Sequence, residues 1–161
     1  LGAEQTFFEE IDLYEMCHDA VQKTAVLCES KGLSVDCENT HVTVRTDSGL
    51  LDQVLMNYLS NAIRYTTEGG KIVISASRDE KNARLTVFNE GEGLPEEELP
   101  KIWESFYKVD KAHSRAYGGS GIGLSVVAAI MQAHRMPYGV RNCRAPDGSP
   151  AVEFYIELQT R

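Results

Sequence analysis

Two asparagines lie one helical turn apart in the segment D-Q-V-L-M-N-Y-L-S-N-A-I-R-Y-T, which begins at Asp52. At about 100° per residue, Asn57 and Asn61 share a helix flank with Arg64 and Tyr65. Asparagine is a poor residue for a helix interior because its amide competes with the backbone for hydrogen bonds. The pair therefore suggests amide groups that face Mg²⁺ and phosphate oxygens. An ordinary solvated helix flank explains the same pattern.

Two glycine-rich segments offer a second kind of chemistry. The first, N-E-G-E-G at residues 89–93, follows an apolar strand, and its G-x-G lets the backbone approach a ligand closely or simply turn. The second, G-G-S-G-I-G-L at residues 118–124, opens an apolar helix, where free N–H groups and the helix dipole favour an anion. We favour phosphate binding there over a plain linker. The segment at residues 118–124 matches neither the Walker loop nor the Rossmann fingerprint.

An aromatic segment, I-W-E-S-F-Y-K, lies between the two glycine clusters at residues 102–108. Trp103 and Phe106 have the spacing to pack this segment against the rest of the domain. Lys108 supplies a cation within reach of whatever the segment covers. Taken alone, the segment indicates only a small satellite core.

The elements that must position these residues form an α/β pattern. Asp47 or Ser48 can cap the asparagine helix, which should end at about Tyr65. We expect three helices on one face of a mixed sheet of about five to six strands. An irregular segment of about 30 residues should act as a functional lid or be disordered. The expected helices cover about 13–30 and 48–65, with a short one at 97–107. A further helix should start near Gly121 and carry Leu124, Val127, Ala128 and Met131 on one side. The expected strands cover 33–37, 41–45, 71–77, 84–89, 138–143 and 152–158.

The composition of the chain limits the fold and the partners that it can have. The chain has 161 residues and a net charge of −8, which fits one domain and argues against a nucleic-acid groove. Its four cysteines are scattered and indicate free thiols. We find no apolar run long enough to span a membrane. Because the chain begins at Leu1, we expect it to be a piece of a longer protein that could carry a membrane anchor.

Four segments, in order, resemble the motifs of the ATP-binding catalytic domain of bacterial sensor histidine kinases, within the gyrase, chaperone and mismatch-repair ATPase superfamily. They are Asn57–Thr66, Asn89–Pro95, Ile102–Lys108 and Gly119–Leu124. The resemblance implies a Bergerat-type two-layer fold with an ATP lid at about 94–120. Residues 1–161 would form a single domain, with 1–12 a linker from a dimerisation and phosphoacceptor domain.

The resemblance also implies roles for individual residues. Asn61 would bind Mg²⁺ between the ATP phosphates, and Asn61, Arg64 and Lys108 would form the catalytic group. Asn89 stands where the family usually has Asp, so its neutral amide would accept from the adenine amino group more weakly. The remaining nucleotide contacts would be Asn57, Tyr65, Gly91, Gly93, Gly119, Gly121, Gly123 and Leu124.

The implied reaction moves the γ-phosphoryl group of ATP to a histidine on a separate domain and then to a response regulator. None of the chain's four histidines has the family's phosphoacceptor context. The domain would lie on the cytoplasmic side of a membrane-anchored sensor. Two alternatives stay open. Another ATPase of the superfamily would need a general-base carboxylate where Asn57 stands, and a nucleotide-sensing or protein-interaction module would bind ATP without transfer.

Overall fold

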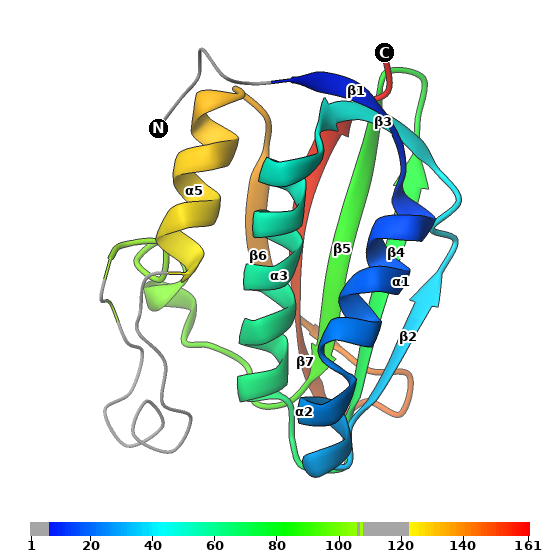
Figure 1. The fold of residues 1–161 in the computed structure, drawn as a ribbon. Coiled ribbons are helices and arrows are strands. Elements are labelled where there is room, and N and C mark those ends of the chain that lie inside the picture. The colour runs from blue at the N-terminus through cyan, green and yellow to red at the C-terminus, as the bar shows by residue number, and fades with distance from the viewer. Residues whose placement is uncertain (1–6, 106, 108–122) are drawn as a thin grey trace.

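A five-stranded sheet in the order β2-β4-β5-β7-β6 forms one layer of the protein (Figure 1). The computed structural model describes residues 7–105, 107 and 123–161. Strand β2 runs parallel to β4, and the other neighbours are antiparallel, so the expected mixed sheet is confirmed. The strands are β2 (Ser34–Glu38), β4 (Lys71–Arg78), β5 (Asn82–Glu90), β6 (Tyr138–Arg144) and β7 (Pro150–Gln159).

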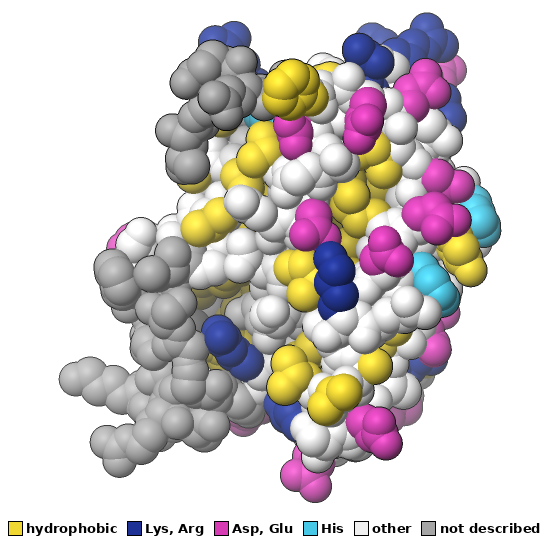
Figure 2. Space-filling model, in the orientation of Figure 1, with side chains coloured by type: hydrophobic (Ala, Val, Ile, Leu, Met, Phe, Trp, Pro, Cys, Tyr) yellow, Lys and Arg dark blue, Asp and Glu magenta, His cyan; other side chains and the backbone are white. Residues whose placement is uncertain are grey.

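The helices all cover the same face of this sheet (Figure 1). They are α1 (Leu13–Lys23), α2 (Ala25–Ser30), α3 (Ser48–Tyr65) and α5 (Gly123–Ala133). The expected two-layer α/β fold is therefore confirmed. Acidic side chains are spread over the outer face of the helices (Figure 2). No helix among the described residues is long and apolar enough to cross a membrane. All four cysteines are free, as expected.

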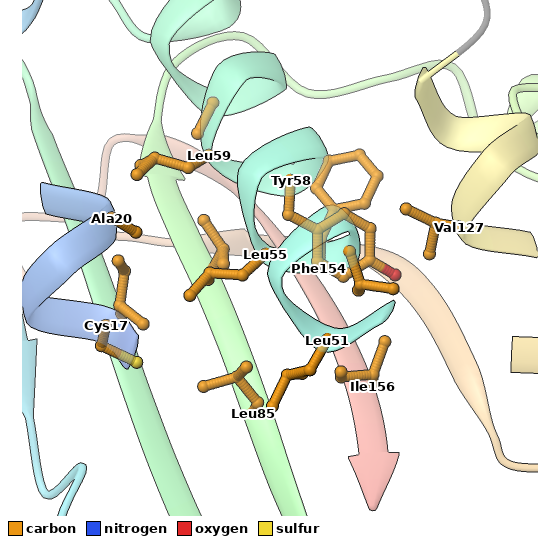
Figure 3. Packing of buried hydrophobic residues seen from close by; sticks show 14 of the residues in the cluster. Cys17, Ala20, Leu51, Leu55, Tyr58, Leu59, Leu85, Val127, Phe154 and Ile156 are labelled. Atoms are coloured by element: carbon orange, nitrogen blue, oxygen red, sulfur yellow. The ribbon is translucent and has the colours of Figure 1, made fainter. Parts of the chain in front are cut away.

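Helix α3 is the centre of the core because its apolar stripe lies across the middle of the sheet (Figures 1 and 3). Tyr58 is 1% exposed, and its hydroxyl donates to the carbonyl oxygen of Tyr155 in β7 at 2.9 Å. Burial raises the pKa of Tyr58, which keeps the phenol a donor. The stripe follows helical periodicity. Its buried members are Leu51, Val54, Leu55, Tyr58, Leu59, Ala62 and Ile63.

A second, two-stranded sheet corrects the expectation that residues 1–12 are a linker. Strand β1 (Phe8–Asp12) pairs antiparallel with β3 (Thr43–Asp47), so this part of the segment belongs to the folded domain. The strand was missed because F-E-E-I-D is largely exposed and shows no alternation of apolar and polar residues.

Two expected helices also differ from the structure. The first is broken at Thr24, whose hydroxyl donates to the carbonyl of Ala20 at 2.9 Å and so competes with helix continuation. The helix expected at 97–107 is only a 3₁₀ turn at Glu96–Glu98, followed by irregular turns up to Ser105. Pro100 explains this, because it lacks the backbone N–H that a longer helix needs there.

Asp47 fixes the start of α3 and ties it to the N-terminal segment. Its carboxylate accepts from the backbone N–H of Phe7 at 2.8 Å and from that of Leu50 at 3.1 Å. The Leu50 bond is the helix cap expected from the sequence. These two bonds, the one from Phe7 first, lower the pKa of Asp47 below its ordinary 3.8.

We predict that Asp47→Asn removes a pH-dependent part of the stability while keeping a capping side chain. A carboxyl whose pKa is lowered on folding stabilises the protein above its unfolded pKa, and this contribution is lost as the pH falls through the folded pKa. At pH 7 the variant should be less stable by about 1 kcal/mol, because bonds to a charged acceptor are stronger. In urea unfolding, the difference in the free energy of unfolding between the two proteins should decrease below pH 3.8. A gap independent of pH would contradict the prediction.

Candidate functional site

A pocket opens where the C-terminal end of α3 meets the end of β5 and the start of α5. It encloses about 470 Å³ of empty space, part of it open to solvent. Polar side chains from α3 and β5 share the wall with apolar side chains from β7 and from the segment after β5. The lining residues are Asn61, Tyr65, Asn89, Glu92, Leu94, Ile102, Tyr107, Leu124, Val152 and Phe154.

Asn89 is the buried polar group of this pocket, with only 1% of its surface exposed. It lies near the end of β5, where β4 and β7 flank it on both sides. Its amide nitrogen donates to the carbonyl oxygen of Glu90 at a long 3.4 Å. No donor among the described residues reaches its amide oxygen, so that oxygen remains an acceptor for a ligand. Asn89 thus offers both hydrogen-bonding functions of an amide to the pocket.

The end of α3 is joined to the end of β5 by a close backbone contact. A Cβ on Gly91 would lie 2.7 Å from the carbonyl oxygen of Tyr65, and the φ of Gly91 is 157°. The contact is reinforced where the N–H of Thr67 donates to the carbonyl of Glu90 at 3.2 Å. Only glycine permits this approach, because any side chain would collide with the Tyr65 backbone. The contact sets the position of Tyr65 relative to Asn89.

Gly93 lies against the side chain of Asn142 and does not line the pocket. A Cβ on Gly93 would lie 2.9 Å from Oδ1 of Asn142 in β6. The amide of Asn142 accepts from the N–H of Leu94 at 2.8 Å and donates to its carbonyl at 2.7 Å. Asn142 therefore fixes the segment that brings Leu94 into the pocket. No sequence pattern marked Asn142, because its partner is distant in the chain.

Asn57 and Arg64 lie outside the lining of the pocket. A Cβ on Gly123 would lie 3.0 Å from Oδ1 of Asn57, so glycine lets α5 begin close to α3. Leu124, the next residue, reaches the pocket, whereas Arg64 is exposed on the outer side of α3. Of the other predicted residues, Lys108, Gly119 and Gly121 lie outside the described part of the chain.

The segment after β5 forms an apolar wall that the sequence marked only in part. Trp103 packs against Tyr138 with ring centroids 4.9 Å apart and against Phe154 at 6.0 Å. This confirms the expected anchoring by Trp103, while its expected partner Phe106 lies outside the described residues. The hydroxyl of Tyr107 donates to the carboxylate of Glu98, which raises the pKa of Tyr107 to about 12.

The pocket can hold a metal only together with a ligand. Among the described residues, no group of three His, Cys, Asp or Glu side chains could bind a metal ion. Asn61 brings a side-chain amide, which carries one oxygen, to the wall. Mg²⁺ takes oxygen ligands, keeps several waters and is commonly bound by one or two protein groups plus substrate phosphates. Asn61 fits such a partial ligand set.

Residues 46–160 match the model of the histidine kinase-, DNA gyrase B- and HSP90-like ATPase family. The chain belongs to this family. Its relatives include the sensor histidine kinase WalK of Bacillus subtilis, 39% identical over 56% of this chain and 15% of WalK. The sensor-like histidine kinase SenX3 of Mycolicibacterium smegmatis is 32% identical over 78% of this chain and 33% of SenX3. The chain thus spans a third or less of these relatives.

The catalytic domain of the histidine kinase ThkA has the same fold. Its nucleotide-free structure covers 96% of both chains with a TM-score of 0.82 and 26% identity. Within the ATPase family, the chain is therefore an ATP-binding catalytic domain of the histidine-kinase type. This confirms the resemblance drawn from the four motifs.

We predict that Gly91→Ala separates the end of α3 from the end of β5. Gly69→Ala is the matched control, because Gly69 has a φ of 77° but open space around its missing Cβ. The control should pay only backbone strain of about 1–2 kcal/mol. Gly91→Ala should cost at least about 2 kcal/mol more in the free energy of unfolding, because overpacking adds to the strain. Equal losses in urea unfolding would show that the Tyr65 contact is unimportant.

Proposed function

We propose that this domain binds MgATP in the pocket and donates the γ-phosphoryl group to a histidine on a separate dimerisation domain. The observation that carries the proposal is the arrangement of the pocket. A buried amide, Asn89, and apolar walls form one part, and Asn61 on α3 and Leu124 at the start of α5 form another. A purine ring suits the first part, and a hydrated Mg²⁺–phosphate group suits the second.

The base would lie against Asn89. The amide oxygen of Asn89 would accept from the adenine amino group, while the amide nitrogen could donate to the neighbouring ring nitrogen. Leu94, Ile102, Val152 and Phe154 would exclude water from the ring, and burial of apolar surface favours such an aromatic group. Gly91 and Gly93 would act indirectly, because they fix the turn that carries this wall.

The phosphates would lie toward Asn61 and the beginning of α5. The oxygen of Asn61 would complete the ligands of Mg²⁺, whose charge offsets the charge of the phosphates. The N-terminus of α5 adds a favourable dipole for an anion. Asn57, Arg64, Lys108, Gly119 and Gly121 remain proposed contacts that rest on the family resemblance. The segment 94–120 would then cover the nucleotide and shield the phosphates from water.

The acceptor must come from outside this pocket. None of the described histidines, His18, His41 and His134, lines it. A nitrogen of the incoming imidazole would attack the γ-phosphorus, and the bond to the oxygen bridging the β-phosphate would break to release ADP. Such transfer depends mostly on positioning and charge neutralisation. The phosphoryl group would pass next to an aspartate of a response regulator.

A response regulator is a reasonable partner because ThkA has been solved in complex with the response regulator TrrA. We extend that partnership to the parent of this chain. We also propose that the parent is a membrane-anchored bacterial sensor kinase with this domain on its cytoplasmic side. The four-motif resemblance and the many sensor kinases among the relatives support both proposals.

Hydrolysis by the chain alone is the less favoured reaction. A superfamily ATPase would need a carboxylate at position 57 to activate water. Asn57 is an amide, which cannot act as a general base, and it packs against the start of α5. An ATP-binding module without transfer is the remaining alternative, and the experiment below separates it from a kinase domain.

The test supplies radiolabelled ATP, Mg²⁺ and a separately expressed phosphoacceptor domain of a related sensor kinase. We expect labelling of the acceptor histidine and calorimetric ATP binding in the micromolar to sub-millimolar range. Asn61→Ala should lose the Mg²⁺-dependent part of binding and reduce transfer by at least about 100-fold, as expected for the loss of a group that orients the metal. Gln53→Ala, on the exposed face of α3, should change neither.

Each failure has a separate meaning. ATP binding without labelling of any supplied acceptor would favour the sensing module. Absence of ATP binding at millimolar concentration would overturn the proposal as a whole. Full Mg²⁺ dependence in Asn61→Ala would remove Asn61 from the metal site but leave the transfer reaction standing.

A further inference from the structure

We propose that the pocket accepts 6-oxopurine nucleotides, inosine and guanosine triphosphates, alongside ATP. The inference rests on the proposed function, in which the base lies against Asn89. It concerns the one buried polar side chain that lines the pocket within the described residues, and that side chain is an amide.

The two purine edges present opposite hydrogen-bonding patterns. Adenine has a donor at its 6-amino group and an acceptor at N1. A 6-oxopurine has an acceptor at O6 and a donor at N1. An amide carries one acceptor and one donor group, so either edge can pair with it after a half-turn of the amide plane. A carboxylate at this position could accept from adenine but could not donate to O6.

The structure leaves the Asn89 amide free to make this half-turn. Within the described residues its side chain makes one hydrogen bond, the 3.4 Å bond from Nδ2 to the carbonyl of Glu90. This distance is longer than a good N–H···O bond, so the half-turn gives up only a weak bond, while it brings Oδ1 in place of Nδ2 toward the Glu90 carbonyl oxygen. Gly91 leaves space beside the Asn89 amide for this rotation. A Cβ at position 91 would lie 3.5 Å from Nδ2, and glycine has none.

The backbone of Asn89, by contrast, is fixed. The residue pairs with Ile72 of β4 on one side and with Val152 of β7 on the other. The side chain is therefore held at one place while its amide can present either group. The base selectivity of this pocket should depend on the amide of Asn89 rather than on movement of the sheet. Asn89 is thus a specificity-determining residue of the site.

Competition calorimetry with Mg²⁺ and ATP, ITP or GTP tests the inference. In the unmodified domain we expect the dissociation constants for ATP and ITP to lie within about tenfold of each other, since both pairings use neutral bonds. Asn89→Asp should tighten ATP and weaken ITP, shifting their ratio by at least about 30-fold, because a buried acceptor would face O6. Gln53→Glu makes the same amide-to-carboxylate change on an exposed helix face and should leave the ratio unchanged.

GTP separates two properties of the base. ITP binding with much weaker GTP binding would overturn the inference for guanosine triphosphate and support it for inosine triphosphate, because only guanine adds a 2-amino group. ATP binding with ITP and GTP both weaker by more than about 100-fold would overturn the inference while the proposed function stands. So would an unchanged ratio in a folded Asn89→Asp protein. Failure of all three nucleotides to bind would instead overturn the proposed function. If Asn89→Asp does not fold, the ratio of the ATP and ITP dissociation constants in the unmodified domain still tests the inference.

Discussion

The pocket depends on the contact between Gly91 and the backbone carbonyl of Tyr65. Helix α3 crosses the sheet through a buried stripe that extends to Ile63, and a local contact then sets the relation of its C-terminal end to β5. The absent Cβ of Gly91 and the bond from Thr67 N–H to the Glu90 carbonyl supply that relation. They bring the asparagine face of α3 beside the buried amide of β5. A base-binding group and a metal-binding group thereby become parts of one site.

The charge of the domain makes the local chemistry of this site important. A net charge of −8 opposes an anionic nucleotide at long range, although salt screens this repulsion beyond about 8 Å. Binding must then rely on short-range groups: the amides of Asn61 and Asn89, the start of α5, and Mg²⁺ held by the ligand's own phosphates. Affinity for this domain should therefore depend more on Mg²⁺ than on a basic surface.

Local patterns in the sequence predicted the parts of the fold that local forces determine. The extent of α3, its Asp47 cap and the five strands of the main sheet follow from periodicity and capping chemistry. The exposed strand β1 has no such periodicity, and the short 3₁₀ turn before Pro100 reflects a missing N–H. The motifs indicated Asn61, Tyr65, Asn89 and Leu124. The wall from Val152 and Phe154 could not be predicted, because it is created by pairing of distant strands.

The most direct test of this account is a nuclear magnetic resonance titration of the domain with Mg²⁺ and a non-hydrolysable ATP analogue. We expect the largest shifts at the side-chain amides of Asn61 and Asn89 and at the backbone amides of Tyr65, Gly91 and Leu124. Removal of Mg²⁺ should reduce the shift of Asn61 more than that of Asn89. Shifts confined to the opposite end of α3, with both side-chain amides unchanged, would contradict the proposed site.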